Sequence, residues 1–333
     1  MTPGTEIQPD AETILRAARR ISPYVNRTPV VTSHTIDRIF DAKVFFKCEN
    51  FQKVGAFKAR GATNAVLSLD KNLLHRGVAT HSSGNHAQAL AWAASLVNAR
   101  AYIVMPSDSS KIKIAAVKGY GGVITLCEPN LASRETTLAG ILVETGATEI
   151  HPYNNERIIA GQATAALELF DDEKELDIVM APVGGGGLLS GTCLSAHYFS
   201  PATRVIAAEP EQADDAWQSF THQRLIPSVN PDTIADGLRT SLGSITFPII
   251  LSHVHDIVTV REESIVKAMR FLWERLKIIV EPSSAVPFAA IMEGKVNISG
   301  KKIGIILSGG NVDLDALPWI KQELPVGNGS QKA

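Results

Sequence analysis

The sequence predicts an α/β protein built on parallel β-sheets that helices cover on both faces. Short apolar runs rich in Val and Ile alternate with longer amphipathic stretches along the chain. Continuous apolar strands separated by helices are typical of parallel sheets that are buried on both faces. The chain has 333 residues, 45% hydrophobic and 20% charged, which is an ordinary globular composition. That length suits one large domain or two smaller domains sharing a cleft.

The apolar runs and the amphipathic stretches place the elements along the chain. The predicted strands are residues 44–47, 78–81, 101–105, 123–127, 178–182, 205–208 and 303–307. The predicted helices are residues 58–69, 85–97, 110–118, 134–144, 160–170, 187–197, 262–276 and 284–293. The strands between about residues 78 and 127 have helices of their own, so we expect a small domain over residues 77–153. Residues 1–76 and 154–333 would build the large domain, and residues 325–333 a frayed polar tail.

Charge and cysteine content exclude several classes of protein. A net charge of −2 gives no reason to expect a nucleic acid or an anionic membrane as partner. The longest apolar runs are far shorter than the roughly 20 residues that span a bilayer, and the first 25 residues do not resemble a secretory signal. The three cysteines, Cys48, Cys127 and Cys193, are widely spaced, which argues against a disulfide framework or a zinc site. We therefore expect a cytoplasmic protein that acts on a small molecule.

Three polar or glycine-rich segments directly follow predicted strands. Residues 82–86 (Ser-Ser-Gly-Asn-His) follow the strand at 78–81, the glycines 184–187 follow the strand at 178–182, and residues 308–310 follow the strand at 303–307. Ligand sites of open parallel sheets lie beyond the carboxyl ends of the strands. We therefore expect these three segments to contribute to one site.

The four consecutive glycines Gly184, Gly185, Gly186 and Gly187 join a predicted strand to a predicted helix. Without Cβ atoms, the backbone N–H groups of such a turn can converge on an anion at the helix N-terminus. No Gly-Lys-Ser/Thr follows, so the segment is not a P-loop, and its spacing does not fit the dinucleotide fingerprint of a nicotinamide-dependent dehydrogenase. The loop predicts a site for the phosphate of a small cofactor, with a tight turn without ligand as the alternative.

A lysine segment near the amino terminus completes the set of motifs. Residues 49–62 read Glu-Asn-Phe-Gln-Lys-Val-Gly-Ala-Phe-Lys-Ala-Arg-Gly-Ala. This segment resembles the cofactor-lysine motif of the fold-type II pyridoxal-phosphate enzymes, specifically the serine racemase and serine/threonine dehydratase group. The resemblance continues in order through residues 27–30, 80–86, 160–162, 184–187, 208–210, 233–237, 280–282 and 307–313. It implies a tryptophan synthase β-like fold, two parallel-sheet domains with the cofactor in the cleft between them.

The resemblance also implies roles for individual residues. Lys58 would hold pyridoxal 5′-phosphate covalently and act as a base, with Phe57 beside the ring and with a pKa lowered by burial near positive charge. Asn85 would bind the ring hydroxyl, the glycines 184–187 the phosphate, and Ser308 the ring nitrogen. The segment formed by Ser82, Ser83, Gly84, Asn85 and His86 would bind the carboxylate of the substrate.

The expected activity is that of a serine racemase, an isomerase, that is also a lyase releasing pyruvate and ammonia from serine. Inversion needs a second acid–base group that faces Lys58, and Ser83 is the candidate, unless Ser83 only lines the carboxylate loop. The alternatives are an L-threonine or L-threo-3-hydroxyaspartate dehydratase and a catalytically silent ligand-binding protein. Arg134 could bind the second carboxylate of hydroxyaspartate or be a solvated helix-start residue. His86 and Tyr153 could shape that end of the pocket. Many relatives have Ser in place of Ala56, which leaves the substrate open.

A divalent metal site is expected after the strand at 205–208. Glu209, the carbonyl of Ala213 and Asp215 offer the oxygen ligands that Mg²⁺ or Ca²⁺ prefers, and Mn²⁺ is an alternative. The serine racemases resemble this sequence at all three positions, and the metal would stiffen the loop below the cofactor. Solvated acidic side chains are the other interpretation. The resemblance further implies a homodimer and leaves a nucleotide effector open.

Overall fold

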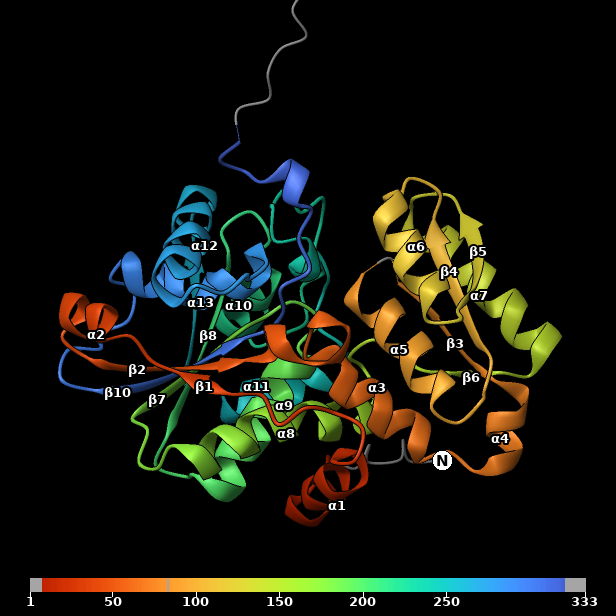
Figure 1. The fold of residues 1–333 in the computed structure, drawn as a ribbon, viewed down its shortest axis with the longest axis horizontal. Coiled ribbons are helices and arrows are strands. Elements are labelled where there is room, and N and C mark those ends of the chain that lie inside the picture. The colour runs from red at the N-terminus through yellow and green to blue at the C-terminus, as the bar shows by residue number, and fades with distance from the viewer. Residues whose placement is uncertain (1–7, 83, 321–333) are drawn as a thin grey trace, which may run out of the picture.

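The computed structural model describes residues 8–82 and 84–320, and its strands form two sheets (Figure 1). The larger sheet has the order β1 (Val30–Val31), β2 (Lys43–Cys48), β10 (Lys302–Leu307), β7 (Ile178–Pro182), β8 (Arg204–Pro210) and β9 (Asp256–Val260). The smaller sheet has the order β5 (Val123–Cys127), β4 (Ala101–Pro106), β3 (Val78–His81) and β6 (Thr148–Glu149). The expected α/β architecture with two sheets is confirmed. The strands of the smaller sheet lie within residues 77–153, although the exact domain boundaries stay a prediction.

All seven predicted strands are present, within two residues of their predicted ends. The strands that sequence analysis missed are β1, β6 and β9. Two of them are only two residues long, too short to stand out as a run, and β9 is a half-exposed edge strand whose Ile-Val-Thr-Val run resembles that of β5 but was not predicted as a strand. β1 pairs antiparallel with β2, which departs from the all-parallel expectation for this sheet.

Helices cover both faces of the larger sheet and flank the smaller one. They are α1 (Ala11–Ile21), α2 (His34–Phe40), α3 (Lys58–Leu67), α4 (Lys71–Arg76), α5 (Asn85–Ser95), α6 (Lys111–Gly119), α7 (Leu131–Thr145), α8 (Glu156–Asp172), α9 (Gly187–Phe199), α10 (Asp215–His222), α11 (Thr246–His253), α12 (Glu262–Leu276) and α13 (Pro282–Met292). The eight predicted helices are confirmed, while α1, α2, α4, α10 and α11 were not predicted. α8 begins four residues earlier than predicted because the Asn155 side chain accepts from two backbone N–H groups of its first turn.

The core explains the layered arrangement. Along β7, Met180 belongs to the apolar cluster on the side of α12 and α13, and its neighbour Val179 belongs to the cluster on the side of α8 and α9. Successive side chains of a strand point to opposite faces, so both faces of this strand are buried. Figure 1 shows α12 and α13 on one side of the larger sheet and α8 and α9 on the other. A third cluster joins α3 to α5, so the helix that begins at Lys58 lies between the two sheets.

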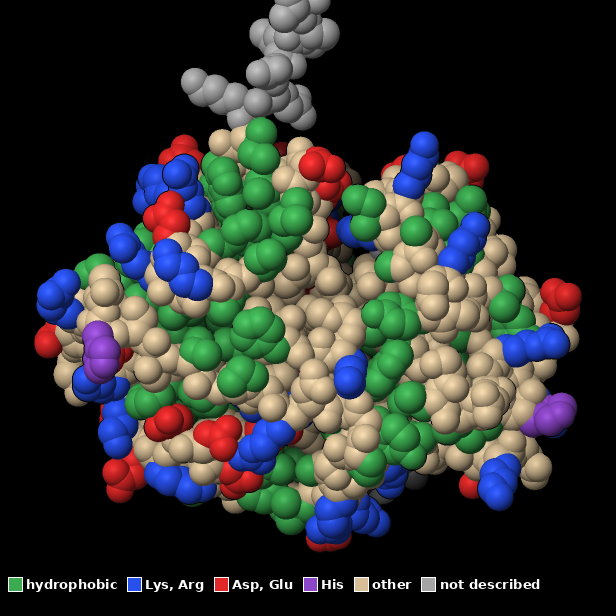
Figure 2. All heavy atoms as spheres, in the orientation of Figure 1, with side chains coloured by type: hydrophobic (Ala, Val, Ile, Leu, Met, Phe, Trp, Pro, Cys, Tyr) green, Lys and Arg blue, Asp and Glu red, His purple; other side chains and the backbone are tan. Residues whose placement is uncertain are grey.

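The surface of the molecule is hollowed between the larger sheet with its helices and the smaller sheet with its helices. On the face shown in Figure 2, the molecule is hollowed between the part that carries α12 and α13 and the part that carries α6. Parallel β2, β10 and β7 end at a common edge, so the loops that follow them start side by side. Within residues 8–82 and 84–320, no helix has the length and apolar character needed to cross a membrane.

Candidate active site

One cavity of about 540 Å³ lies where the loops of the two sheets meet. That volume is in the usual range for a small-molecule site. The predicted cofactor and substrate residues that line it are Phe57, Lys58, Ser82, Gly84, Asn85, His86, Arg134, Gly184, Gly185, Gly186, Gly187 and Ser308. Ser83, the predicted second acid–base group, lies outside the described residues. The structure thus brings together segments that the chain separates by about 250 residues.

Lys58 is the first residue of α3, and its amine points into this cavity. The Nζ atom donates a hydrogen bond to the carbonyl of Pro152 at 2.8 Å and lies 5.1 Å from the centre of the Phe57 ring. Burial lowers the pKa of Lys58 to about 8, although the charge of Glu281 raises it. The neighbouring charge is negative, so the expected contribution of a positive region is wrong and burial accounts for the lowered pKa.

The lysine segment is fixed to the segment that carries Ser308. Ala56 forms an antiparallel bridge with Gly309, and the Phe57 N–H donates to the Ser308 carbonyl at 2.9 Å. Gly55 has a φ of +69°, and a Cβ on it would lie 2.6 Å from Oδ1 of Asn311, so only glycine fits there. The backbone therefore fixes Lys58 relative to Ser308.

The glycine loop leaves β7 and enters α9. Gly186 has a φ of +87° and caps the 13-residue helix. In the described part of the chain, none of the backbone N–H groups of Gly184, Gly185, Gly186 and Gly187 has a hydrogen-bond acceptor. Four unpaired donors at the positive end of a helix dipole fit a phosphate group.

Tyr153 supplies a second reason for the glycines. Its ring lies against the loop, so a Cβ on Gly185 would clash with the ring, and a Cβ on Gly187 would lie 2.9 Å from Cβ of Tyr153. The Tyr153 hydroxyl shares a hydrogen bond of 2.8 Å with the hydroxyl of Thr240, and the His151 ring packs edge-on at 4.6 Å. Tyr153 therefore forms one wall of the cavity and supports the loop.

Ser308 follows β10 and is buried at 2% exposure. Its hydroxyl lies 3.1 Å from the hydroxyl of Ser284, whose oxygen is also 2.6 Å from the Gly309 carbonyl. Ser284 has a single proton, and the carbonyl can only accept, so Ser284 donates there and Ser308 is the donor in the contact between the two hydroxyls. The Ser308 hydroxyl is therefore a donor, which it could turn to a neutral ring nitrogen.

Sequence analysis gave no role to Glu281, which lines the same cavity. Asn85 donates to both Glu281 oxygens, at 3.0 and 3.1 Å, and the Asn311 N–H donates to Oε2 at 3.2 Å. Burial raises the pKa of Glu281 to about 7. Because the Asn85 amide already donates to Glu281, it can bind a ring hydroxyl only by sharing one of these N–H groups. Glu281 follows no strand, so the pattern that marked the other segments could not have found it.

The substrate end of the cavity contains several histidines. His86 lies next to the Ile150 carbonyl, 3.0 Å from Nε2, and burial lowers the pKa of His86 to about 3, so the ring is neutral. A neutral, hydrogen-bonded and buried His86 fits the interpretation as a packed residue. Arg134, in the first turn of α7, lines the cavity together with His81 and His151. Its Nε is buried without a hydrogen-bond partner among the described residues, and a contact with the substrate stays a prediction beside the alternative of a solvated helix-start residue.

The predicted metal ligands lie outside the lining of this cavity, where β8 leads into α10. Glu209 is buried, and its carboxylate accepts from the backbone N–H groups of Ala216 at 3.3 Å and Trp217 at 2.5 Å. Oδ2 of Asp215 is buried without a hydrogen-bond partner. The part of the chain that the structure describes has no group of three acidic, histidine or cysteine side chains arranged for a metal. An unpartnered buried carboxylate oxygen nevertheless fits a cation, with carbonyl and water ligands completing the set.

Comparisons with known proteins agree with this geometry. Residues 21–309 match the family model described as pyridoxal-phosphate dependent enzyme. The chain is 51% identical to a β-hydroxyaspartate dehydratase of Paracoccus denitrificans, over 93% of this chain and 99% of the relative. It is 47% identical to a serine racemase of Dictyostelium discoideum, over 92% and 96% of the two chains. The solved structure of maize serine racemase superposes with a TM-score of 0.91 at 45% identity, covering 93% of this chain and 95% of that one.

Proposed function

Since the chain belongs to the pyridoxal-phosphate dependent enzymes, we propose that it is a serine racemase that also eliminates water from serine to give pyruvate and ammonia. The observation that carries the proposal is the Lys58 amine, which lies in one cavity with four unpaired N–H groups of the glycine loop and with the Ser308 hydroxyl. This set fits an aldehyde, a phosphate and a ring nitrogen of one cofactor. Proteins named serine racemase that resemble the chain come from slime mould, plants, yeast and rat, at 43–48% identity.

The cofactor, when bound, withdraws electron density from the α carbon of an amino acid and so eases loss of the α proton. Lys58 would hold the cofactor and move that proton at its Nζ atom. A pKa of about 8 suits this work, because a general base acts best when its pKa is near the working pH. The glycine loop, Ser308 and Asn85 would hold the phosphate, the ring nitrogen and the ring hydroxyl, and Phe57 would lie beside the ring.

The segment between β3 and α5 would bind the substrate carboxylate. Ser82 and Gly84 line the cavity, and the N-terminus of α5 begins at Asn85, where backbone N–H groups attract an anion. Racemisation requires that a second group return the proton on the face opposite Lys58. We assign this step to Ser83, on the resemblance of the Ser-Ser-Gly-Asn-His motif to the racemases.

A product assay tests this proposal. The purified, cofactor-loaded protein would be given L-serine, D-serine, L-threonine and L-threo-3-hydroxyaspartate, and the same assay would be run on Ser83→Ala and Lys58→Ala. We expect the wild type to interconvert the serine enantiomers and Ser83→Ala to lose inversion while it still eliminates water from L-serine. Lys58→Ala should lose both activities and the visible absorption band of the bound cofactor. Failure to form D-serine would refute the racemase assignment, and an absent band in wild type would favour a silent binding protein.

A hydroxyaspartate dehydratase is the second candidate, because a cationic side chain lies at the substrate end of the cavity. Arg134 lies there with His151, whose Nδ1 accepts from the backbone N–H of Asn154 at 2.9 Å. The His151 proton is therefore on Nε2, which can donate to a carboxylate. Arg134→Gln should raise KM for hydroxyaspartate much more than KM for serine, with Arg134→Lys intermediate. Equal changes for both substrates would rule out this role.

Three further features complete the proposal. Glu209, Ala213 and Asp215 would bind Mg²⁺, or Ca²⁺ or Mn²⁺, below the cofactor, which the unpartnered oxygen of Asp215 supports. The resemblance to the racemases supports a homodimer, which light scattering would test. The three free, buried cysteines support a reducing cytoplasm, which cell fractionation would test. A nucleotide effector remains an open part of the proposal, and an assay with and without ATP at fixed Mg²⁺ would decide it.

A further inference from the structure

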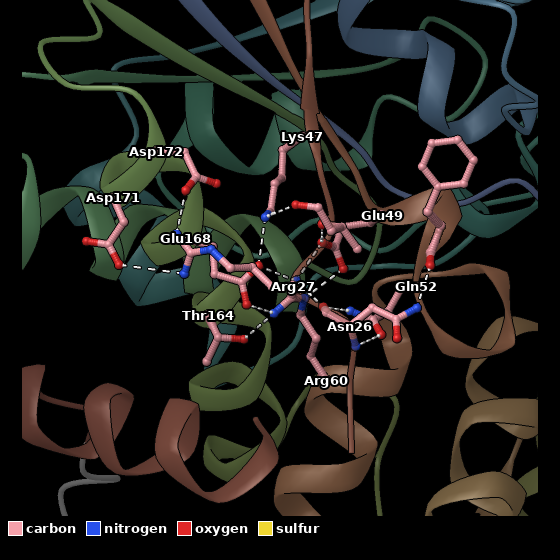
Figure 3. Close-up of polar contacts among 12 residues, drawn as sticks. Asn26, Arg27, Lys47, Glu49, Gln52, Arg60, Thr164, Glu168, Asp171 and Asp172 are labelled. Atoms are coloured by element: carbon pink, nitrogen blue, oxygen red, sulfur yellow. Dashed lines mark hydrogen bonds and ion pairs between the residues drawn. The ribbon is translucent and has the colours of Figure 1, made fainter. Parts of the chain in front are cut away.

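A buried network of charged side chains lies behind the lysine segment, on the side away from the cavity. Figure 3 shows its centre, the Arg60 guanidinium, between Glu49 of the segment after β2 and Glu168 of α8, with Lys47 of β2 beside Glu168. The side chains of Arg60, Glu49 and Lys47 are fully buried, and that of Glu168 is 16% exposed. Two cations face two anions, so the network is neutral as a whole.

The hydrogen bonds of Arg60 are complete. Its Nε and Nη2 atoms donate to the two oxygens of Glu49 at 2.7 and 2.8 Å, and Nη1 and Nη2 donate to the two oxygens of Glu168 at 2.8 Å each. The remaining Nη1 proton points to the Thr164 hydroxyl at 3.1 Å. Two bidentate pairs use the planar fork of a guanidinium in a way that an ammonium cannot reproduce.

This network ties the beginning of the lysine segment to its end. Glu49 is the first residue of this segment and Arg60 lies near its end, so their ion pair joins residues that lie 11 positions apart on either side of Lys58. The loop between them contains Val54 with a φ of +54°, a conformation that is strained for a β-branched residue. A strained loop keeps its shape only when its surroundings hold it.

The same network ties α3 to α8. Thr164 and Glu168 lie on α8, and the segment just before α8 supplies the Pro152 carbonyl that accepts from Lys58 at 2.8 Å. Where the two helices touch, the contact is between glycines, since a Cβ on Gly161 would lie 2.6 Å from Cα of Gly61. Such a contact brings the two backbones close. Asn64 of α3 donates to the Arg157 carbonyl of α8 at 2.7 Å, and Gln162 of α8 accepts from the Gly61 N–H at 3.2 Å. Arg60 adds the charged hydrogen bonds to Glu168 and the bond to Thr164 between the same two helices.

We propose that Arg60 is a positioning residue, which through Glu49, Glu168 and Thr164 holds α3 against α8 so that the Lys58 amine stays beside the Pro152 carbonyl. The inference rests on the proposed role of Lys58 as the cofactor lysine. Arg60 touches neither the cavity nor the reacting atoms, so its influence acts only through the position of Lys58. An ordinary buried ion network only stabilises the fold. Loss of the Arg60 network should in addition change kcat and the pH midpoint of the cofactor bound to Lys58.

The test compares Arg60→Lys, which keeps the charge but loses the fork, with Thr164→Val, which keeps all four charges and loses the hydroxyl that accepts from Arg60 and donates to the Gly161 carbonyl. The control is Ile265→Val, a fully buried change in α12 that is remote from α3. Each variant would be measured for thermal unfolding, for the pH midpoint of the visible band of the lysine-bound cofactor, and for kcat and KM separately. We expect Arg60→Lys to lower kcat by about 10- to 100-fold with KM little changed, as for a misplaced catalytic group. Its pH midpoint should move, and Thr164→Val should change in the same direction by less.

Each outcome shows whether Arg60 positions Lys58 or only stabilises the folded protein. Arg60→Lys and Thr164→Val proteins that unfold at lower temperature but keep the wild-type midpoint and kcat would overturn the inference, as would equal changes in Ile265→Val. If Arg60→Lys does not fold, Thr164→Val decides alone, and wild-type behaviour in it counts against positioning. A wild type that lacks the band, or a Lys58→Ala protein that keeps it, would instead refute the proposed function.

Discussion

The side-chain amide of Asn85 donates to both carboxylate oxygens of Glu281, at 3.0 and 3.1 Å. Asn85 begins α5 beside the smaller sheet, and Glu281 caps α13 on the larger one, so this contact joins the two parts across the cavity. Asn311 closes the arrangement, because its Nδ2 donates to Oδ1 of Asn85 at 2.8 Å. Glu281 is therefore an acidic group held in a fixed position, close enough for its charge to raise the pKa of Lys58.

The first prediction concerns the pH dependence of cofactor binding. The Lys58 amine must be unprotonated to react, so incorporation of the cofactor into the apo-protein should rise with pH around a midpoint near 8. Glu281 raises the pKa of Lys58, so Glu281→Gln should move this midpoint down by about 0.5 pH unit or more. The rate at which the visible band appears, measured from pH 6 to about 9.5, gives the midpoint. Glu263→Gln, an exposed change in α12, is the control. An upward shift would contradict this account.

The second prediction concerns the fit between Tyr153 and the glycine loop. Gly185→Ala places a methyl group against the Tyr153 ring and should destabilise the protein by about 1–3 kcal/mol, as overpacking does. It should also weaken cofactor binding. In a protein that already carries Tyr153→Ala, Gly185→Ala should lower the free energy of unfolding by less. A double-mutant cycle of denaturant unfolding measures this coupling. Gly140→Ala, which has open space on α7, should be neutral or stabilising. If the losses of unfolding free energy from Gly185→Ala and Tyr153→Ala simply add, the new methyl group does not clash with the Tyr153 ring.

The apolar runs were sufficient to predict the main strands, because inner strands of a parallel sheet such as β7 and β10 are buried on both faces and are apolar almost throughout. The edge strand β5 was found from its Val, Ile and Leu although most of its residues are partly or fully exposed. The apolar runs also located the site, since the segments after β3, β7 and β10 all line the cavity. The identity of Lys58 came from the resemblance, because a lysine after an aromatic residue has no distinctive pattern. The pattern of apolar runs shows where each strand ends, and ligand sites of parallel sheets lie just beyond the carboxyl ends of the strands.

The contacts across the cavity could not be predicted. Asn85 and Glu281 are 196 residues apart, and Asn85 and Asn311 are 226 apart, so no local periodicity relates them. The same holds for Arg60 and Glu168, which are 108 positions apart. Arg60 looked like one more helical residue in sequence, and only the packing of α3 on α8 shows that it is buried. Tertiary packing, not local preference, decides such positions.

The third prediction concerns the metal. Saturating Mg²⁺ at about 100 times its Kd should stabilise the protein by roughly 2.7 kcal/mol, and a chelator should reverse this. Asp215→Asn should abolish the shift, yet in chelator it should be at least as stable as wild type, because it removes a buried carboxylate whose Oδ2 has no hydrogen-bond partner in the described part of the chain. Asp214→Asn, whose side chain accepts from Gln218 at 2.7 Å, should keep the response to Mg²⁺. A wild type whose unfolding temperature ignores Mg²⁺, Ca²⁺ and Mn²⁺ would remove the metal from the proposed function.

The fourth prediction concerns an ion pair at the mouth of the cavity. Nζ of Lys113, on α6, lies 2.6 Å from Oδ2 of Asp236, in the segment after Ala235, and both residues line the cavity. Their side chains are 38% and 53% exposed, so the pair should contribute at most about 1 kcal/mol to the free energy of unfolding. It does, however, join the two parts that enclose the cofactor. We therefore expect Lys113→Ala to speed cofactor release several-fold with almost no change in unfolding temperature.

Salt provides an independent check on this pair, because exposed ion pairs are screened at high ionic strength. Release from the wild type should accelerate as salt rises, while release from Lys113→Ala should respond less. The exchange Lys113→Asp with Asp236→Lys should restore slow release. Arg270→Ala is the control, because it breaks an exposed pair of 3.0 Å to Glu274 that lies within α12 and joins no two parts of the molecule. If release is equally fast in wild type and Lys113→Ala at low salt, the pair does not hold the cavity closed, and other contacts between the two sides, such as those of Asn85 with Glu281 and Asn311, account for slow release.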